Sequence, residues 1–326
     1  MVECWAPAED ENGSKSGFNQ EPAPPAPSEA PTSCLRPPTA VSRVDAHAAC
    51  ERHQQRDENG ELKGFQSGAG TASSDQPLTS HLSHLTSIFG VDAVILAGDK
   101  EGRAQLPVAS RPMLTWVIAA LQASGCISRL AVVGAPQLAA DIPPEITLVP
   151  AGATTVDSAI NGAAVFPAAA WLLLVTADIP LLKPEAVRDF LERCRQRSAD
   201  FYYPIVSREN NEASYPGVKR TYVRLRDGTF TGGNMVLMRT AALKACASRG
   251  QELVRLRKSP LRLSQLIGLK FIIKFLTRRL TIAEAEKHFS RLLGVRGAAI
   301  ISPYPEIGID VDKESDLELA RRVLGG

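Results

Sequence analysis

The chain has 326 residues, of which 44% are apolar and 22% charged, a composition typical of a soluble globular protein with one or two domains. Its net charge of +2 gives it no general attraction to nucleic acid, so we expect no nucleic-acid partner. The six cysteines have neither C-x-x-C nor metal-ligand spacing, and no apolar stretch is long enough for a membrane span. We therefore expect a cytoplasmic protein with free thiols.

Residues 1–87 differ in composition from the rest of the chain. They are rich in Pro, Ala, Ser, Glu and Gln, and their few large apolar residues recur with no period. Such a segment cannot bury enough surface to offset chain entropy, which predicts a disordered, low-complexity N-terminal extension. We hypothesise that this extension partly reflects the choice of start codon, and peptides from residues 1–80 in the native protein would contradict that. Residues 88–326 are predicted to form one domain.

From Val91 onward, predicted strands alternate with predicted helices, which favours βαβ units and a parallel sheet. After Asp200 the pattern loosens into a mixed sheet edge that builds a substrate lobe. The predicted strands are 91–97, 129–133, 146–149, 171–176, 201–206, 221–225, 234–238, 297–301 and 307–311. The predicted helices are 111–124, 155–165, one opening at Pro184, a basic helical insert at 251–296, and 313–324.

The first candidate for chemistry is the loop after the strand 91–97. It contains glycine and basic residues and leads into a helix, so its backbone N–H groups can cradle phosphates. Lys100, Arg103 and Arg111 can neutralise a triphosphate. The loop matches neither a P-loop nor a G-x-G-x-x-G dinucleotide fingerprint. An ordinary joint between a strand and a helix stays open as the alternative.

The second candidate is Asp178, which follows a continuous apolar run, Trp171-Leu-Leu-Leu-Val-Thr176. Such a run is typical of a strand buried on both faces, and ligands of open α/β sheets bind at the carboxyl ends of the strands. A carboxylate in that place is a natural ligand for a hard cation such as Mg²⁺. The alternative is an aspartate that only caps the following turn.

Two further groups of residues are candidates. Asp310 and Asp312 alternate at the end of the predicted strand 307–311 and can complete a metal site with Asp178. The alternative is that Asp312 or Ser315 only caps the last helix. Gly232, Gly233 and Asn234 allow close approach of a ligand to the backbone, with a hairpin turn as the alternative.

In combination these motifs resemble those of a known family. The order Leu-Ala-Gly…Leu-Pro-Val…Arg-Pro-Met-Leu, then Thr-Ala-Asp-Ile-Pro, then Gly-Gly-Asn, then Asp-Val-Asp is similar to that of nucleotidyltransferases. More narrowly, it resembles the molybdenum-cofactor-guanylyltransferase-like NTP transferases, over residues 91–326. The resemblance implies a Rossmann-like three-layer α/β/α fold with a mostly parallel, mixed sheet, of the nucleotide-diphospho-sugar transferase type. It also implies transfer of a nucleoside monophosphate from an NTP to a phosphorylated acceptor, with release of pyrophosphate and Mg²⁺ as cofactor.

The resemblance further implies a role for each matching residue. Catalysis would rest on Lys100 and Arg103, in a loop 99–103 that wraps the triphosphate, and on Asp178. Asp178 would be the main Mg²⁺ ligand, Asp312 the second, and Asp310 a substitute. Leu96, Ala97 and Gly98, with Ser158 or Asn161, would bind the nucleotide, and Gly233 and Asn234 would line the acceptor side.

The loop departs from the family pattern in two positions. Asp99 stands where the family has a second glycine, and Arg103 stands near the position of a lysine. Asp99 places a negative charge beside the expected triphosphate, and an arginine head is wider and planar. This departure motivates a second hypothesis, a catalytically weak nucleotide-binding regulatory protein. A third, a glycosyltransferase of related fold, is disfavoured because Thr176-Ala-Asp-Ile-Pro180 replaces the expected Asp-x-Asp.

The segment 263–280 is strongly apolar, and Lys270, Lys274 and Arg278 follow one another at intervals of four residues. A helix there would carry these cations on one face. We favour packing of its apolar side on the core, with the cations solvated. Peripheral contact with an anionic membrane, or with a lipid-linked or phosphorylated acceptor, is the alternative.

Overall fold

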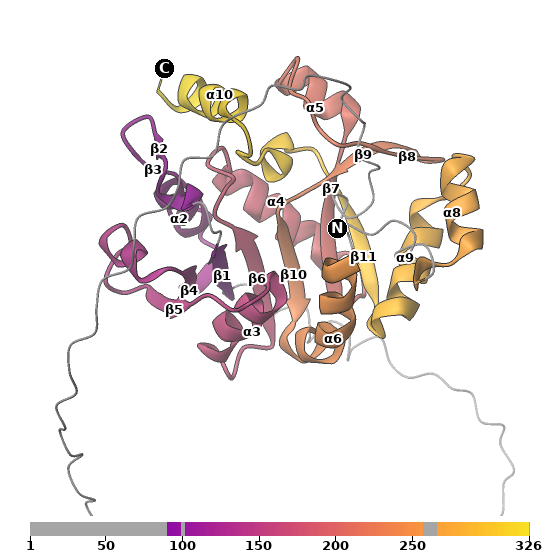
Figure 1. Cartoon of the computed structure of the whole chain (residues 1–326), viewed down its shortest axis with the longest axis horizontal. Coiled ribbons are helices and arrows are strands. Elements are labelled where there is room, and N and C mark those ends of the chain that lie inside the picture. The colour runs from indigo at the N-terminus through magenta and orange to yellow at the C-terminus, as the bar shows by residue number, and fades with distance from the viewer. Residues whose placement is uncertain (1–89, 99–101, 257–265, 326) are drawn as a thin grey trace, which may run out of the picture. The chain divides into compact units, whose positions relative to one another are not determined.

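The computed structural model describes residues 90–98, 102–256 and 266–325 (Figure 1). The predicted extension 1–87 therefore lies outside the described residues. The strands are β1 (Val91–Ala97), β2 (Pro107–Val108), β3 (Arg111–Pro112), β4 (Ile127–Gly134), β5 (Thr147–Pro150), β6 (Trp171–Thr176), β7 (Phe201–Ser207), β8 (Val223–Leu225), β9 (Gly228–Gly232), β10 (Met235–Arg239) and β11 (Gly297–Ser302). The α-helices are α2 (Met113–Ala123), α3 (Thr155–Ala164), α4 (Pro184–Arg195), α5 (Arg208–Ser214), α6 (Thr240–Leu256), α8 (Leu269–Leu276), α9 (Ile282–Leu293) and α10 (Glu314–Leu324).

Nine of these strands form one mixed sheet with the order β5-β4-β1-β6-β10-β7-β9-β8, and β11 pairs with β7. The pairings among β5, β4, β1 and β6 are parallel, as is that of β11 with β7. Strand β10 runs antiparallel to both β6 and β7 and joins the two halves. The predicted mixed sheet is thus confirmed, with its parallel part concentrated in the N-terminal half.

Helices cover both faces of this sheet, which gives the predicted three layers. On one face, α2 and α4 pack on side chains such as Ile95 and Leu173. On the other face, α3, α6, α8 and α9 contribute to a second apolar cluster, which includes Val94 of β1 and Leu172 of β6. Neighbouring residues of β1 and β6 are therefore buried on opposite faces, which explains their unbroken apolar sequences. A third apolar cluster joins α10 to the β2–β3 hairpin.

The strand predicted at 307–311 is not formed. Residues Pro305–Gly308 make a short 3₁₀ helix, η4, and the chain beyond it is extended but unpaired. Its backbone bonds go to two different elements: the Ile307 carbonyl accepts from Asn234 N–H at 2.8 Å, and Val311 N–H donates to the Asp178 carbonyl at 2.9 Å. The segment therefore crosses the ends of β10 and β6 and does not pair along either one.

The predicted insert at 251–296 also has a different form. Helix α6 already begins at Thr240, and Gly268 at φ 92° precedes the eight-residue helix α8. Arg278 has a left-handed backbone at φ 57° and lies beyond the end of α8. The prediction that Lys270, Lys274 and Arg278 share one helical face is therefore wrong, because the helix ends before the third cation.

Candidate active site

The site lies at the edge of the sheet where β1 and β6 end. Strands β4 and β6 flank β1 on opposite sides, so the order of the strands reverses there, and such switch points bind ligands in open α/β sheets. Because β10 is antiparallel, it begins at this edge: Met235 pairs with Val175. The sheet therefore brings the loop after β1, Asp178 and the Gly-Gly-Asn segment to one place, although they are far apart in sequence.

Asp178 follows the buried strand β6 by two residues. One of its carboxylate oxygens accepts a hydrogen bond from the Thr176 hydroxyl, which fixes its orientation. Burial raises the pKa of Asp178 above its ordinary value, and the charge of Asp312 acts in the same direction. The Thr176 hydroxyl, a backbone N–H group and Arg103 act in the opposite direction without cancelling the effect. Burial is thus the largest influence on this carboxylate.

Asp310 and Asp312 reach Asp178 because the chain between them is anchored by apolar neighbours. Ile309 and Val311 are buried in the third apolar cluster, which holds the segment against the end of β6. One oxygen from each of the three carboxylates lies within 4.8 Å of the others. The structure therefore brings together all three predicted metal ligands, including Asp310, which had been expected only as a substitute.

Two arginines pair with these carboxylates. Arg103, in the short helix η2 (Arg103–Gln105), makes an ion pair with Asp312 and donates a long hydrogen bond of 3.4 Å to the Val311 carbonyl. Arg220 makes an ion pair with Asp310 and donates a hydrogen bond of 2.9 Å to its carbonyl oxygen. Both side chains of this second pair are only 9% exposed, and the buried Nε of Arg220 has no hydrogen-bond partner among the described residues.

Arg220 is the residue that sequence reasoning missed. It follows Lys219 in a polar loop between α5 and β8 and belongs to no motif. A basic pair in a loop of the predicted substrate lobe was the only signal, and surface loops carry such pairs routinely. The arginine is recognised as part of the site only when the fold places it on Asp310.

The predicted nucleotide-binding residues lie around the end of β1. Leu96 pairs with Thr176 and Val133, and Ala97 pairs with Gly134, so both belong to the sheet beside Asp178. A Cβ on Gly98 would lie 2.8 Å from Cβ of Ala151, so only glycine allows this close approach of the loop after β5. Gly98 is exposed and lies beside Ser158 of α3.

Ser158 and Asn161 of α3 shape the loop after β5. The Ser158 hydroxyl accepts a hydrogen bond of 3.0 Å from Gly152 N–H, and the Asn161 amide donates one of 3.1 Å to the Pro150 carbonyl. Both side chains therefore hold the backbone that faces Gly98. Their predicted role in holding the base stays a prediction.

Gly233 and Asn234 join β9 to β10 beside the carboxylates. Gly233 is buried, and a Cβ there would lie 2.5 Å from Ile307 and 2.8 Å from Pro204. The glycine is thus required for packing of η4 on the sheet. The backbone of Asn234 is paired with both Ile307 and Thr176. Its partly exposed side chain makes no hydrogen bond among the residues described, so it is free to line an acceptor site.

The remaining cations predicted for the site differ in their placement. Lys100 lies outside the described residues, as does the neighbouring acidic residue Asp99. Arg111 stacks on Trp116, with its guanidinium carbon 3.7 Å from the ring centre, in the β2–β3 region. Arg103 is therefore the one of the three that the structure shows at the carboxylates.

The three carboxylates fit a divalent cation in their chemistry. Hard cations take oxygen ligands, and three carboxylate oxygens within 4.8 Å of one another form a donor set of that kind. Arg103 and Arg220 now supply the positive charge at two of the three carboxylates. A cation bound there would compete with them for Asp312 and Asp310.

Comparison with known proteins assigns this arrangement to a family. The family model described as the MobA-like NTP transferase domain matches residues 93–262. A structure described as a hypothetical transferase from Thermus thermophilus is 38% identical, covers 70% of this chain and 99% of its own, and superposes with a TM-score of 0.64. No curated protein matches the chain.

Two more distant structures belong to enzymes named for cytidylyl chemistry. A 4-diphosphocytidyl-2C-methyl-D-erythritol synthase from Anaerococcus prevotii is 12% identical, covers 74% of this chain and 99% of its own, and has a TM-score of 0.49. A 2-C-methyl-D-erythritol 4-phosphate cytidylyltransferase from Thermus thermophilus is 18% identical, covers 72% and 98%, and has a TM-score of 0.44.

Proposed function

The chain belongs to the family of MobA-like NTP transferase domains, and we propose that it moves a nucleoside monophosphate from an NTP to a phosphorylated small-molecule acceptor. Pyrophosphate is the second product, and Mg²⁺ is the cofactor. The observation that carries this proposal is the cluster of Asp178, Asp310 and Asp312 at the sheet's switch point. In a family of NTP transferases, a set of oxygen ligands at that edge is suited to a metal-bound triphosphate.

The reaction has a simple balance of bonds. An oxygen of the acceptor phosphate attacks the α-phosphorus of the NTP, and a new P–O bond forms. The bond from that phosphorus to the oxygen bridging the β-phosphate breaks, and its electron pair leaves with pyrophosphate. Because two anions must meet, catalysis depends on charge neutralisation and positioning, and no nucleophilic side chain is needed.

Named residues of this chain have distinct parts in the proposal. Asp178, Asp310 and Asp312 would hold Mg²⁺, which when bound neutralises phosphate charge and orients the phosphates. Arg103 and Arg220 are next to the proposed Mg²⁺ position, because they form ion pairs with Asp312 and Asp310. Displaced from these carboxylates, each guanidinium can bind a phosphate oxygen with two N–H groups. Lys100 is proposed as a third cation for the triphosphate.

The two sides of the site receive the two substrates. The nucleotide is proposed to lie over Leu96, Ala97 and Gly98, next to the loop that Ser158 and Asn161 hold. The acceptor is proposed to lie on the side of Gly233 and Asn234, where β10 begins. The donor and acceptor thus meet above Asp178, which lies between these segments in the sheet order.

The test is Mg²⁺-dependent release of pyrophosphate. GTP, CTP, ATP and UTP are each incubated with a pool of phosphorylated acceptors, for the unaltered chain, for Asp178→Ala and for Asp189→Ala. Asp189 is the matched control because it is a carboxylate in an ion pair with Arg193 on α4, away from the site. Release that is lost only in Asp178→Ala supports the proposal and identifies the donor base.

Other outcomes give different conclusions. No release, with nucleotide still bound in calorimetry, would favour a regulatory nucleotide-binding protein of the same fold. Asp99→Gly, which brings back the glycine of the family pattern, would then be the first variant to test. Transfer of sugar from a sugar nucleotide without pyrophosphate would favour a glycosyltransferase. Equal release by Asp178→Ala and the unaltered chain would overturn the assignment of Asp178.

A further inference from the structure

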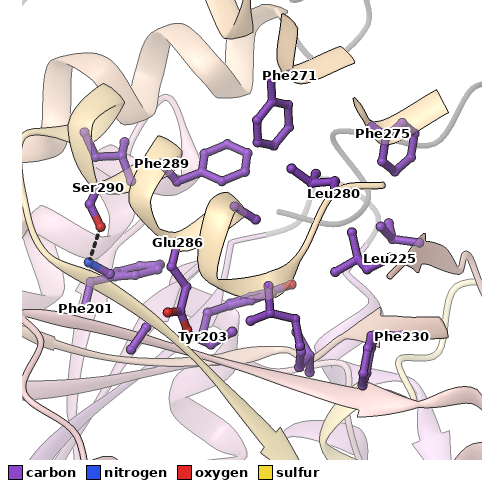
Figure 2. Close-up of a pocket in the computed structure, with 18 residues that line it drawn as sticks. Phe201, Tyr203, Leu225, Phe230, Phe271, Phe275, Leu280, Glu286, Phe289 and Ser290 are labelled. Carbon is purple, nitrogen blue, oxygen red and sulfur yellow. Dashed lines mark hydrogen bonds between the residues drawn. The ribbon is translucent and has the colours of Figure 1, made fainter. Parts of the chain in front are cut away.

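A cavity lined almost entirely by carbon lies between the sheet and helices α8 and α9 (Figure 2). Its volume is about 150 Å³, and its walls come from β7, β8, β9 and β11 on one side and from α8 and α9 on the other. Aromatic rings form much of the lining: Phe201, Tyr203 and Phe230 from the strands, and Phe271, Phe275 and Phe289 from the helices. The inner side of α8 is therefore apolar and faces a space that protein atoms do not fill.

The Glu286 and Ser290 side chains in the lining of this cavity are engaged by the protein. The Glu286 carboxylate accepts from Arg197 at 2.6 Å and from Ala299 N–H at 2.7 Å. The Ser290 hydroxyl accepts from Gly297 N–H at 2.9 Å. Because both groups are engaged and the rest of the lining is almost entirely carbon, the surroundings that suit this side of α8 are apolar.

The outer side of α8 is apolar as well. Leu269 is 71% exposed, Ile273 51% and Leu276 71%. These three residues follow one another at intervals of four and three, which places them in one stripe on the helix surface. Among the described residues only five large hydrophobic side chains are exposed, and three of them are in this stripe. A helix that is apolar on two sides is typical of one that meets an apolar medium.

Cations surround this stripe. Lys270, Arg278 and Arg279 are exposed and have no ion-pair partner in the described part of the chain, while Lys274 pairs with Glu284. No acidic residue occurs between Gly268 and Thr281. A second copy of the same face would bring these positive charges together, which disfavours self-association through α8. An anionic surface is complementary to them.

We propose that the outer face of α8 docks on an anionic lipid surface. Leu269, Ile273 and Leu276 enter the boundary between headgroups and acyl chains, and Lys270, Arg278 and Arg279 meet lipid phosphates. None of the described helices is both long and apolar enough to cross a bilayer, and α8 has eight residues, so the helix lies along the interface. This proposal is independent of the proposed transfer reaction.

The experiment is sedimentation of the full chain, without nucleotide, with vesicles of phosphatidylcholine alone or mixed with phosphatidylglycerol. We expect partition into the anionic vesicles that weakens with salt, and little into the neutral ones. The triple variant Leu269→Ser, Ile273→Ser, Leu276→Ser should partition at least about tenfold less, since it loses three apolar side chains from the interface. Lys270→Gln with Arg279→Gln should reduce only the part that depends on anionic lipid.

The control variant is Ile301→Ser with Val323→Ser. These residues are 48% and 45% exposed, but they lie on β11 and α10 and do not belong to the stripe, so partition should not change. Circular dichroism confirms that each variant is folded. No partition of the unaltered chain, or equal partition of the triple variant, overturns the proposal. A dimer in ultracentrifugation that the triple variant abolishes would also overturn it and assign the face to a second copy.

Discussion

Two of the three carboxylates of the site are ion-paired with arginines, which affects both stability and binding. Asp310 and Arg220 form a pair that is almost fully buried, and each provides the charge that the other needs. Asp312 and Arg103 form the corresponding pair near the surface, where Asp312 is about half exposed. A cation at the three carboxylates would therefore compete with one buried arginine and one partly exposed arginine.

Replacing Arg220 by Met should lower the free energy of unfolding by about 3–5 kcal/mol, because Asp310 is left as a buried charge without its partner. Urea unfolding measures this. The control is Arg208→Met in helix α5, whose partner Glu212 is half exposed, and here the loss should stay below about 1 kcal/mol.

The Arg220→Met variant also tests whether Asp310 is a metal ligand or a purely structural aspartate. If Asp310 binds Mg²⁺, added Mg²⁺ should stabilise Arg220→Met more than the unaltered chain, because the arginine no longer competes for the carboxylate. Equal stabilisation of both proteins by Mg²⁺ would mean that Asp310 serves Arg220 alone.

Gly233→Ala should destabilise the protein by about 1–3 kcal/mol, since its Cβ would lie 2.5 Å from Ile307 and η4 would have to move. Gly250→Ala is the matched control. Gly250 lies within α6, and a Cβ there would make ordinary contact with Val156 at 3.6 Å. Alanine at this position should stabilise the helix by up to about 1 kcal/mol. Thermal unfolding of both variants tests the opposite signs, and a neutral Gly233→Ala would contradict the packing role.

At the scale of elements, the buried strands were the most predictable. The observed bounds of β1 and β6 are the predicted ones, because a strand covered on both faces has an unbroken apolar sequence with sharp ends. The alternating sequence Ile307-Gly-Ile-Asp-Val311 has the pattern of a strand for a different reason. Ile309 and Val311 are buried under α10, while the aspartates lie at the site. Period alone cannot distinguish these two origins.

Helices α8 and α9 are joined by aromatic contacts that include a histidine. His288 of α9 stacks on Phe271 of α8 with ring centres 4.3 Å apart, and its buried Nε2 has no hydrogen-bond partner among the described residues. Burial lowers the pKa of His288, and the charge of Arg291 adds to this, while a hydrogen bond to the Ile267 backbone acts in the opposite direction. The neutral ring is therefore the form that this contact favours.

Acidification should destabilise this contact. The unfolded chain takes up the His288 proton near the ordinary value of 6.5, and the folded chain takes it up only at lower pH. Stability from this group is thus fully present above that range and falls as pH decreases from about 6.5 to the lowered pKa. His288→Phe, which keeps a ring on Phe271, should remove this dependence in thermal unfolding at a series of pH values. An unchanged dependence would place the titrating group elsewhere.

At the scale of the whole molecule, the linear order of motifs predicted the site better than any motif alone did. The predicted carboxylates meet because β6, β10 and the segment after η4 converge on one edge of the sheet. Arg220 could not be predicted, because its role depends on a loop of the second half of the sheet reaching Asp310. Each sequence pattern describes neighbouring residues, whereas the pairing of Arg220 with Asp310 joins residues that are 90 positions apart.

Because the site is built from both halves of the sheet, a ligand bound there should stabilise the whole domain. Mg²⁺ with the correct NTP at about 100 times its dissociation constant should add about 2.7 kcal/mol, which raises the Tm of a domain of this size by about 5–10 °C. Thermal unfolding with each NTP, with Mg²⁺ or with a chelator, measures this shift. Asp178→Asn should lose the Mg²⁺-dependent part and keep any shift caused by nucleotide alone, whereas Asp189→Asn should respond like the unaltered chain. A shift of the same size in Asp178→Asn would show that binding of the nucleotide does not depend on this carboxylate, and the assignment of Asp178 as a Mg²⁺ ligand would then be wrong.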